Sequence, residues 1–124
     1  MRVLVAEDNE MARDLLMRYL RLAGHEFVLF ADGNDAWEFL DVVGGDRFNV
    51  IISDHEMPEM SGIELLRRVR ADTRTANIPF FLTSGAMAVS EMDQRGLEEV
   101  CIGLGATFVL KPYNCEELVA QIAG

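Results

Sequence analysis

The chain has 124 residues, half of them apolar, and is therefore predicted to form one compact domain over residues 1–124. Its 21 acids against 11 lysines and arginines give a net charge of -10, and the basic residues are scattered, which argues against direct nucleic-acid binding. No segment approaches the ~20 continuous apolar residues of a membrane span, and the N-terminus lacks the apolar region of a signal peptide. We expect a cytoplasmic protein with no membrane contact. Cys101 and Cys115 stand outside any metal or redox motif.

Short apolar, β-prone runs alternate with helical patterns along the chain. The runs are apolar on both faces, which is typical of buried parallel strands, and they cover residues 3–6, 27–30, 49–53, 79–84 and 107–110. The first helical pattern follows Asn9 and ends before Gly24, which suits a C-terminal cap. The second is expected to start at Asn34 as its N-terminal cap and to end before Gly44.

Capping boxes mark the starts of the third and fifth predicted helices. Ser61 with Glu64 forms one, and Asn114 with Glu117 forms a looser one. Strict alternation of strands and helices implies right-handed crossovers and a parallel sheet with helices on both faces, a doubly wound α/β fold.

The fourth helical pattern is the weakest. It runs from Ser90 to Leu104 and contains Gly96, which costs ~1 kcal/mol in a helix interior. We expect a loop before Ser90 and a helix that is weak around Gly96.

Chemically active side chains stand where the predicted strands end. They are Glu7 and Asp8 after the first strand, Asp54 after the third, Thr83 and Ser84 in the fourth and Lys111 after the fifth. The carboxyl ends of parallel strands share one edge of the sheet, which is where such folds bind ligands. Clustered carboxylates suit Mg2+, and with a lysine beside them Asp54 can attack phosphorus to form an acyl phosphate. The alternative is that the acids are solvated helix caps.

The segments VLVAEDNE, SDHEMPEMSG, FFLTSGA and FVLKP, in this order and spacing, resemble a response-regulator receiver domain of bacterial two-component signalling over essentially the whole chain. The resemblance implies a flavodoxin-like (βα)5 fold with five parallel strands in the order 2-1-3-4-5. It also implies a phosphorelay switch rather than an enzyme, although such a domain assists its own phosphorylation and dephosphorylation. A histidine kinase or a histidine phosphotransfer protein would supply the phosphoryl group, and an output partner would read the altered face of the fourth and fifth helices.

The resemblance assigns the chemistry to five residues. Asp54 matches the phosphorylated aspartate, and Lys111 matches the lysine that contacts the phosphoryl group. Asp8 and Asp54 match ligands of Mg2+, and Glu7 matches the acid that holds the metal through water. Glu56, two positions after the acceptor, would offer its backbone carbonyl to the same metal.

The resemblance also assigns the switch. Ser84 matches the switch hydroxyl because it stands five residues after Pro79, and Phe108 matches the aromatic ring that turns inward on activation. The Lys111–Pro112 peptide bond is usually cis in this family. The interval from Ser84 to Lys111, 111 minus 84 or 27 positions, is a handful longer than usual, which concerns the output surface rather than the chemistry.

Three other functions fit parts of the sequence. A haloacid-dehalogenase-type phosphatase also forms an aspartyl phosphate and has an acid where Glu56 stands, but its second acidic motif is missing. A flavodoxin-like or nucleotide-binding module would need a Gly-rich loop after the first strand, where Glu7 and Asp8 stand instead. A receiver that acts only as a docking module is excluded by no residue.

Three further features have two interpretations. The Glu56 side chain is predicted to influence the lifetime of the phosphoryl group, or else it is an acid that only faces solvent. His55 is predicted to pack rather than to act as a base, because neighbours on a strand point to opposite faces. The methionines, including Met57, Met60, Met87 and Met92, form either an adaptable docking surface or ordinary packing.

Overall fold

The structure is a computed structural model that describes residues 1–85 and 94–124. Within these residues the strands are β1 (Arg2–Ala6), β2 (Glu26–Phe30), β3 (Val50–Asp54), β4 (Phe80–Gly85) and β5 (Thr107–Lys111). They form one parallel sheet in the order β2-β1-β3-β4-β5, which confirms the predicted topology. The register places Val3 beside Val50 and Asp54 beside Thr83.

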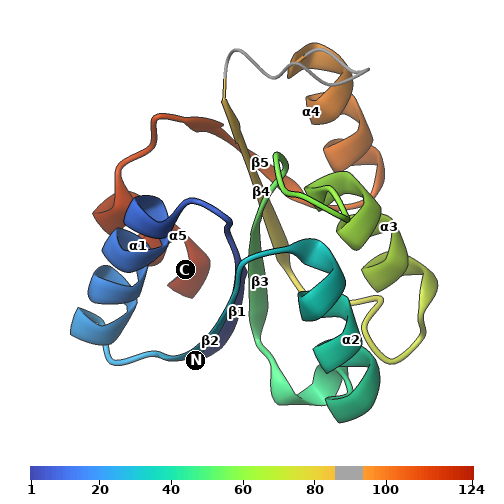
Figure 1. Cartoon of the computed structure of the whole chain (residues 1–124), viewed down its shortest axis with the longest axis horizontal. Coiled ribbons are helices and arrows are strands. Elements are labelled where there is room, and N and C mark those ends of the chain that lie inside the picture. Colours follow the sequence, from blue (N-terminus) through green and yellow to red (C-terminus); the bar gives the residue numbers. More distant parts are fainter. Residues whose placement is uncertain (86–93) are drawn as a thin grey trace.

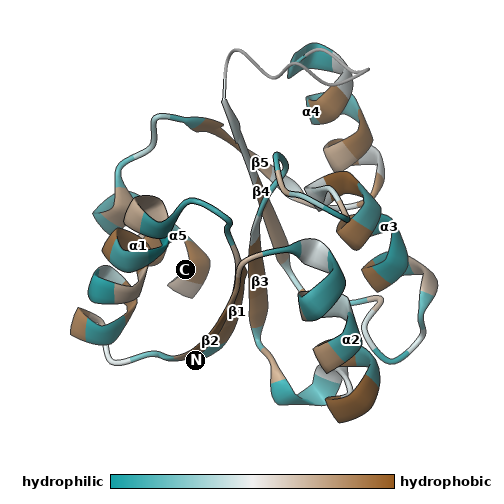
Figure 2. Cartoon of the chain, viewed as in Figure 1, coloured by the Kyte–Doolittle hydropathy of each residue, from teal (hydrophilic) through white to brown (hydrophobic). Residues whose placement is uncertain are grey.

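Helices cover both faces of the sheet. They are α1 (Glu10–Leu22), α2 (Gly33–Val43), α3 (Gly62–Ala71), α4 (Gln94–Gly103) and α5 (Cys115–Ala123), with a short 3-10 helix, η1 (Gly45–Arg47), after α2. In Figure 1, α1 and α5 lie on one side of the sheet, and α2, α3 and α4 lie on the other. Figure 2 shows that the central strands are hydrophobic while the helices alternate between hydrophobic and hydrophilic residues, as expected for a sheet buried between two helical layers.

The described residues form a core on each face of the sheet. Successive residues of β1 divide between the two cores, so that Leu4 packs with α2, α3 and α4 while Val3 and Val5 pack with α1 and α5. β3 is buried along its whole length, and Asp54 at its end is buried as well. The core therefore delivers a carboxylate to the edge of the sheet.

Side-chain caps define the starts of four helices, and one prediction was wrong. Asn9, Ser61 and Asn114 cap α1, α3 and α5 as expected. The cap of α2 is Asp32 rather than Asn34: its carboxylate accepts the N–H of Asp35 at 2.8 Å. Asp32 has the extended backbone that a cap requires, and its carboxylate is a stronger acceptor than an amide. The helix therefore begins at Gly33, the residue after Asp32.

The described part of α4 lies within the predicted helix from Ser90 to Leu104. It includes Gly96 and ends at Gly103, so the glycine does not end the helix. The predicted start at Ser90 and the loop before it lie outside the described residues.

Arg70, near the end of α3, joins two loops at the edge of the sheet where β4 and β5 start, opposite to the carboxyl ends of the strands. Its guanidinium donates to the carbonyl oxygens of Leu104 and Ile78, both at 2.6 Å, and to those of Ala76 and Gly105 at 3.2 and 3.4 Å. Arg70 thereby connects the α3–β4 loop to the α4–β5 turn. We call this set of contacts the Arg70 anchor.

Among the described residues, no helix combines the length and the apolar character that crossing a membrane requires.

Candidate functional site

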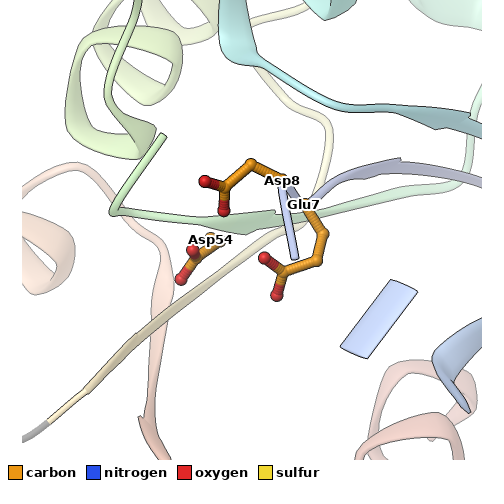
Figure 3. Close-up of side chains that lie close together, drawn as sticks. All are labelled: Glu7, Asp8 and Asp54. Atoms are coloured by element: carbon orange, nitrogen blue, oxygen red, sulfur yellow. The ribbon is translucent and has the colours of Figure 1, made fainter. Parts of the chain in front are cut away.

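Three carboxylates meet at the carboxyl ends of β1 and β3. Glu7 and Asp8 directly follow β1, and Asp54 is the last residue of β3. One oxygen from each lies within 4.8 Å of the others, and Figure 3 shows the three side chains gathered at one place. Glu7 and Asp54 are each only 3% exposed, whereas Asp8 is exposed to solvent. The structure thus brings together the acids that the sequence predicted as metal ligands.

Lys111 supplies positive charge to this cluster. Its Nζ lies 2.8 Å from Oδ1 of Asp54 and 3.3 Å from Oε1 of Glu7. Since β4 separates β5 from β3, the lysine side chain crosses one strand to reach Asp54. The peptide bond between Lys111 and Pro112 is cis, as the resemblance implied. Burial opposes the charge on Lys111, but the two carboxylates outweigh it and raise its pKa.

One ammonium group does not offset the burial of Asp54. Burial raises the pKa of Asp54 to about 7; the hydrogen bond from Lys111 acts in the opposite direction, and the charge of Glu7 raises the pKa further. An additional cation beside these oxygens would favour the ionised carboxylate. Carboxylate oxygens are hard donors of the kind that Mg2+ prefers, so the residues fit this ion.

The start of α1 holds Glu7 in position. The backbone N–H of Asn9 donates to Oε2 of Glu7 at 3.2 Å, while Arg13 donates to the Glu7 carbonyl oxygen at 3.0 Å. The Asn9 side chain accepts the N–H of Ala12 at 2.9 Å. The same short segment therefore caps the helix and orients a carboxylate.

A tight turn after β3 keeps Asp54 at the rim of the sheet. The carbonyl oxygen of His55 accepts the N–H groups of Met57 and Gly62, at 3.1 and 3.0 Å. A Cβ atom at Gly62 would lie 2.8 Å from the Cα of His55 and closer still to the carbonyl oxygen of Asp54. Only glycine lets α3 begin so close to Asp54 and His55.

The Ser84 hydroxyl contacts Glu56 rather than Asp54. Oγ of Ser84 donates to Oε1 of Glu56 at 2.7 Å, and the N–H of Gly85 donates to the same oxygen at 3.3 Å. Thr83 contacts Asp54 instead, with its hydroxyl 3.4 Å from Oδ1 of Asp54. Burial opposes the charge on Glu56, but hydrogen bonds, first among them that from Ser84, lower its pKa overall.

Sequence reasoning assigned separate roles to Ser84 and Glu56 and missed the bond between them. The order of strands contained a signal, because β3 and β4 are neighbours. An acid two residues past the end of one strand can reach a hydroxyl at the end of the next.

Three other predicted residues lie close to this site or to the core below it. His55 is buried, as expected for a packing residue, and its Nδ1 has no hydrogen-bond partner among the described residues. Phe108 is partly buried and packs against the core of α2, α3 and α4. Met60 is 4% exposed, which makes it a core residue; the predictions for Met87 and Met92 lie outside the described residues.

An apolar groove borders the site on the side of α1. It has a volume of about 500 Å3 and includes Lys111 in its wall. Its apolar lining comes from α1 and from the segment after β5, and includes Met11, Ala12, Leu15, Pro112, Tyr113 and Cys115. Met11 and Leu15 are 80% and 46% exposed. We call this the α1 groove.

Comparisons with known proteins agree with this geometry. The chain is 34% identical over 126 residues to the chemotaxis protein CheY1 of Helicobacter pylori, covering 98% of this chain and 94% of that protein. It is 30% identical to the chemotaxis protein CheY of Pseudomonas aeruginosa, covering 98% and 93%.

Solved structures give the same result. The chemotaxis response regulator CheY4 of Vibrio cholerae superposes with a TM-score of 0.80 at 28% identity, covering 98% of this chain and 95% of that one. The receiver domain of the sensor histidine kinase PA1611 from Pseudomonas aeruginosa, solved with a magnesium ion in its active-site cleft, has a TM-score of 0.79 at 25% identity, covering 98% and 93%. The family model of the response regulator receiver domain matches residues 3–123, and the chain belongs to this family.

Proposed function

We propose that the chain is a phosphorelay switch in which Asp54 accepts a phosphoryl group from a histidine kinase or a histidine phosphotransfer protein. The observation that supports this most strongly is the buried carboxylate of Asp54 at a strand end, 2.8 Å from the Lys111 ammonium and beside Glu7 and Asp8. Among the described residues, this arrangement unites a nucleophile, a fixed cation and further acids in one place.

The proposed transfer is a displacement at phosphorus. A carboxylate oxygen of Asp54 forms a bond to phosphorus while the P–N bond to the donor imidazole breaks. The ring nitrogen keeps the electron pair of that bond and takes up a proton from solvent. Lys111 then pairs with a phosphoryl oxygen, which spreads the added negative charge.

Glu7, Asp8 and Asp54 would hold Mg2+, and the Glu56 backbone carbonyl is a further predicted ligand. When bound, the ion neutralises part of the charge that accumulates on the transferring oxygens. Asn9 and Arg13 keep Glu7 oriented toward this place through the contacts described above. The residues of the chain thus fix the acids before the donor arrives.

The α1 groove is our proposed docking site for the phosphohistidine protein. Lys111 lines both the groove and the acidic cluster, so a partner seated there would bring its histidine beside Asp54. The exposed side chains of Met11 and Leu15 offer apolar surface that such a partner can bury. Output would follow from a shift between two conformations, in which Ser84 and Phe108 are the predicted moving parts.

Intact-mass measurement with acetyl phosphate and Mg2+ tests the acceptor. The parent chain should gain one phosphoryl group, and Asp54→Asn should gain none. The matched control is Asp14→Asn, which removes a carboxylate from an exposed position of α1 and should be labelled like the parent. A chelator should prevent labelling of the parent. Full labelling of Asp54→Asn would place the acceptor elsewhere and contradict the proposal.

A further inference from the structure

The Glu56 carboxylate accepts hydrogen bonds from two donors at the end of β4, the Ser84 hydroxyl and the Gly85 N–H. The Ser84 hydroxyl has one proton to donate, and at 2.7 Å it gives this proton to Oε1 of Glu56. The Gly85 N–H points at the same oxygen, at 3.3 Å. Ser84 itself is fully buried, so solvent does not compete for its hydroxyl. Hydrogen bonds to a carboxylate are short and stronger than those between neutral groups.

A phosphoryl group on Asp54 would require donors from the same region. Its oxygens are strong acceptors, and Ser84 is the predicted hydroxyl partner in this family. The hydroxyl cannot donate its single proton to Glu56 and to a phosphoryl oxygen at once. The carboxylate of Glu56 also adds negative charge beside Asp54, Glu7 and Asp8, which disfavours an approaching phosphate.

We propose that Glu56 is a positioning residue that holds Ser84 and Gly85 in the place of a phosphoryl oxygen, so that phosphorylation must displace its carboxylate. This rests on the proposed function and adds a group within the chain that competes with the phosphoryl group for the same two hydrogen-bond donors. Glu56 thereby favours the conformation in which Ser84 is turned to the β3–α3 loop. Removing its carboxylate releases both donors for the phosphoryl group.

Two variants separate this role from a general effect of charge. Glu56→Ala removes the acceptor and the charge, and Glu56→Gln keeps an acceptor oxygen of similar reach without the charge. Glu59→Gln removes one negative charge from the same loop, three residues further on, and serves as the matched control. Glu59 has a left-handed backbone with φ of 66°. Glutamine has the same side-chain length and branching, so the substitution does not change the backbone strain at this position.

The first measurement is the affinity for beryllofluoride at saturating Mg2+, followed by 19F NMR. We expect Glu56→Ala to bind roughly ten-fold tighter than the parent, since one charged hydrogen bond no longer has to be broken. Glu56→Gln should fall between the two, and Glu59→Gln should match the parent. In a Ser84→Ala background, Glu56→Ala should bring a much smaller gain, because the shorter of the two hydrogen bonds to Glu56 is already absent.

The second measurement is the backbone amide of Gly85, followed by 15N NMR without beryllofluoride. Its resonance should move and its hydrogen exchange should quicken in Glu56→Ala but not in Glu59→Gln. Unchanged beryllofluoride affinity or an unchanged Gly85 amide in Glu56→Ala would overturn the proposal, as would weaker Mg2+ binding that identifies the Glu56 side chain as a metal ligand. If the parent neither binds beryllofluoride nor is labelled by acetyl phosphate, the proposed function itself fails, and the amide measurement still decides whether Glu56 holds Gly85.

Discussion

Replacing Asp54 with asparagine is expected to make the chain more stable above pH 7, although the change removes half of an ion pair with Lys111. Asparagine resembles the protonated, uncharged form of the aspartate in size and shape. The buried environment already favours that uncharged form, because it raises the pKa from 3.8 to about 7. The variant therefore fixes the uncharged form, and above pH 7 it avoids the cost of burying the charged one.

The size of the effect follows from the shift in pKa. A rise from 3.8 to about 7 is about three units, and at ~1.4 kcal/mol per unit it corresponds to ~4 kcal/mol. Between these two pH values the folded chain holds a proton that the unfolded chain has released, so the stability of the parent falls as pH rises through this window. Above pH 7 the full difference applies, and we expect Asp54→Asn to be more stable by about 2 to 4 kcal/mol. Below pH 4 the two chains should differ little.

Urea unfolding at several pH values between 4 and 8, with a chelator present, measures this difference. Asp14→Asn, at an exposed position of α1, should follow the parent at every pH. Mg2+ should then stabilise the parent, by ~2.7 kcal/mol when its concentration is 100 times the dissociation constant, and should stabilise Asp54→Asn much less. An Asp54→Asn chain that is no more stable than the parent at pH 8 would refute the reasoning.

Two other substitutions test features of the described structure. Arg70→Met keeps the apolar stem of the side chain but loses its four hydrogen bonds to carbonyl oxygens. It should lower the free energy of unfolding by ~2 to 4 kcal/mol. Arg67→Met, at an exposed position of the same helix, should have little effect. A loss below ~0.5 kcal/mol, the usual range for a surface change, would mean that the anchor adds no stability. Met11→Ser should slow phosphoryl transfer from a phosphohistidine protein several-fold but leave labelling by acetyl phosphate unchanged. Leu22→Ser, exposed at the other end of α1, should change neither the transfer rate nor the labelling. Equal slowing with both donors would argue against docking in the α1 groove.

Sequence reasoning located the acidic site because each of its members is marked locally. A strand that is apolar on both faces and ends in an acid places that acid at the carboxyl edge of a parallel sheet, as Glu7 and Asp54 are placed. The caps at Ser61 and Asn114 were also visible, because the cap and the N–H that it accepts are three residues apart. The match to the family model confirms the predicted receiver domain and leaves the phosphatase and flavodoxin alternatives without support.

Other features depend on residues far apart in the chain, which a sequence pattern does not bring together. The bond between Ser84 and Glu56 spans 28 positions, and that between Arg70 and the Leu104 carbonyl spans 34. Arginines follow one another on α3, and nothing in their spacing distinguishes Arg70 from Arg67. The cap of α2 was misplaced because Asp32, Asn34 and Asp35 are all residue types that begin helices, and only the backbone decides among them.

The Arg70 anchor has a mechanical consequence for α4. It holds the carbonyl oxygen of Leu104, one residue after the helix ends, at the edge of the sheet where β5 starts, opposite to the edge where Ser84 lies. We therefore expect any movement of α4 to be a rotation about a point near Gly103, where the Arg70 anchor holds the chain, rather than a sliding motion. The helix has ten residues and is about 15 Å long, so a tilt of ~10° carries its Gln94 end through about 2.6 Å. Anchored in this way, α4 would convert a small tilt into a larger displacement of the end that lies farther from Arg70.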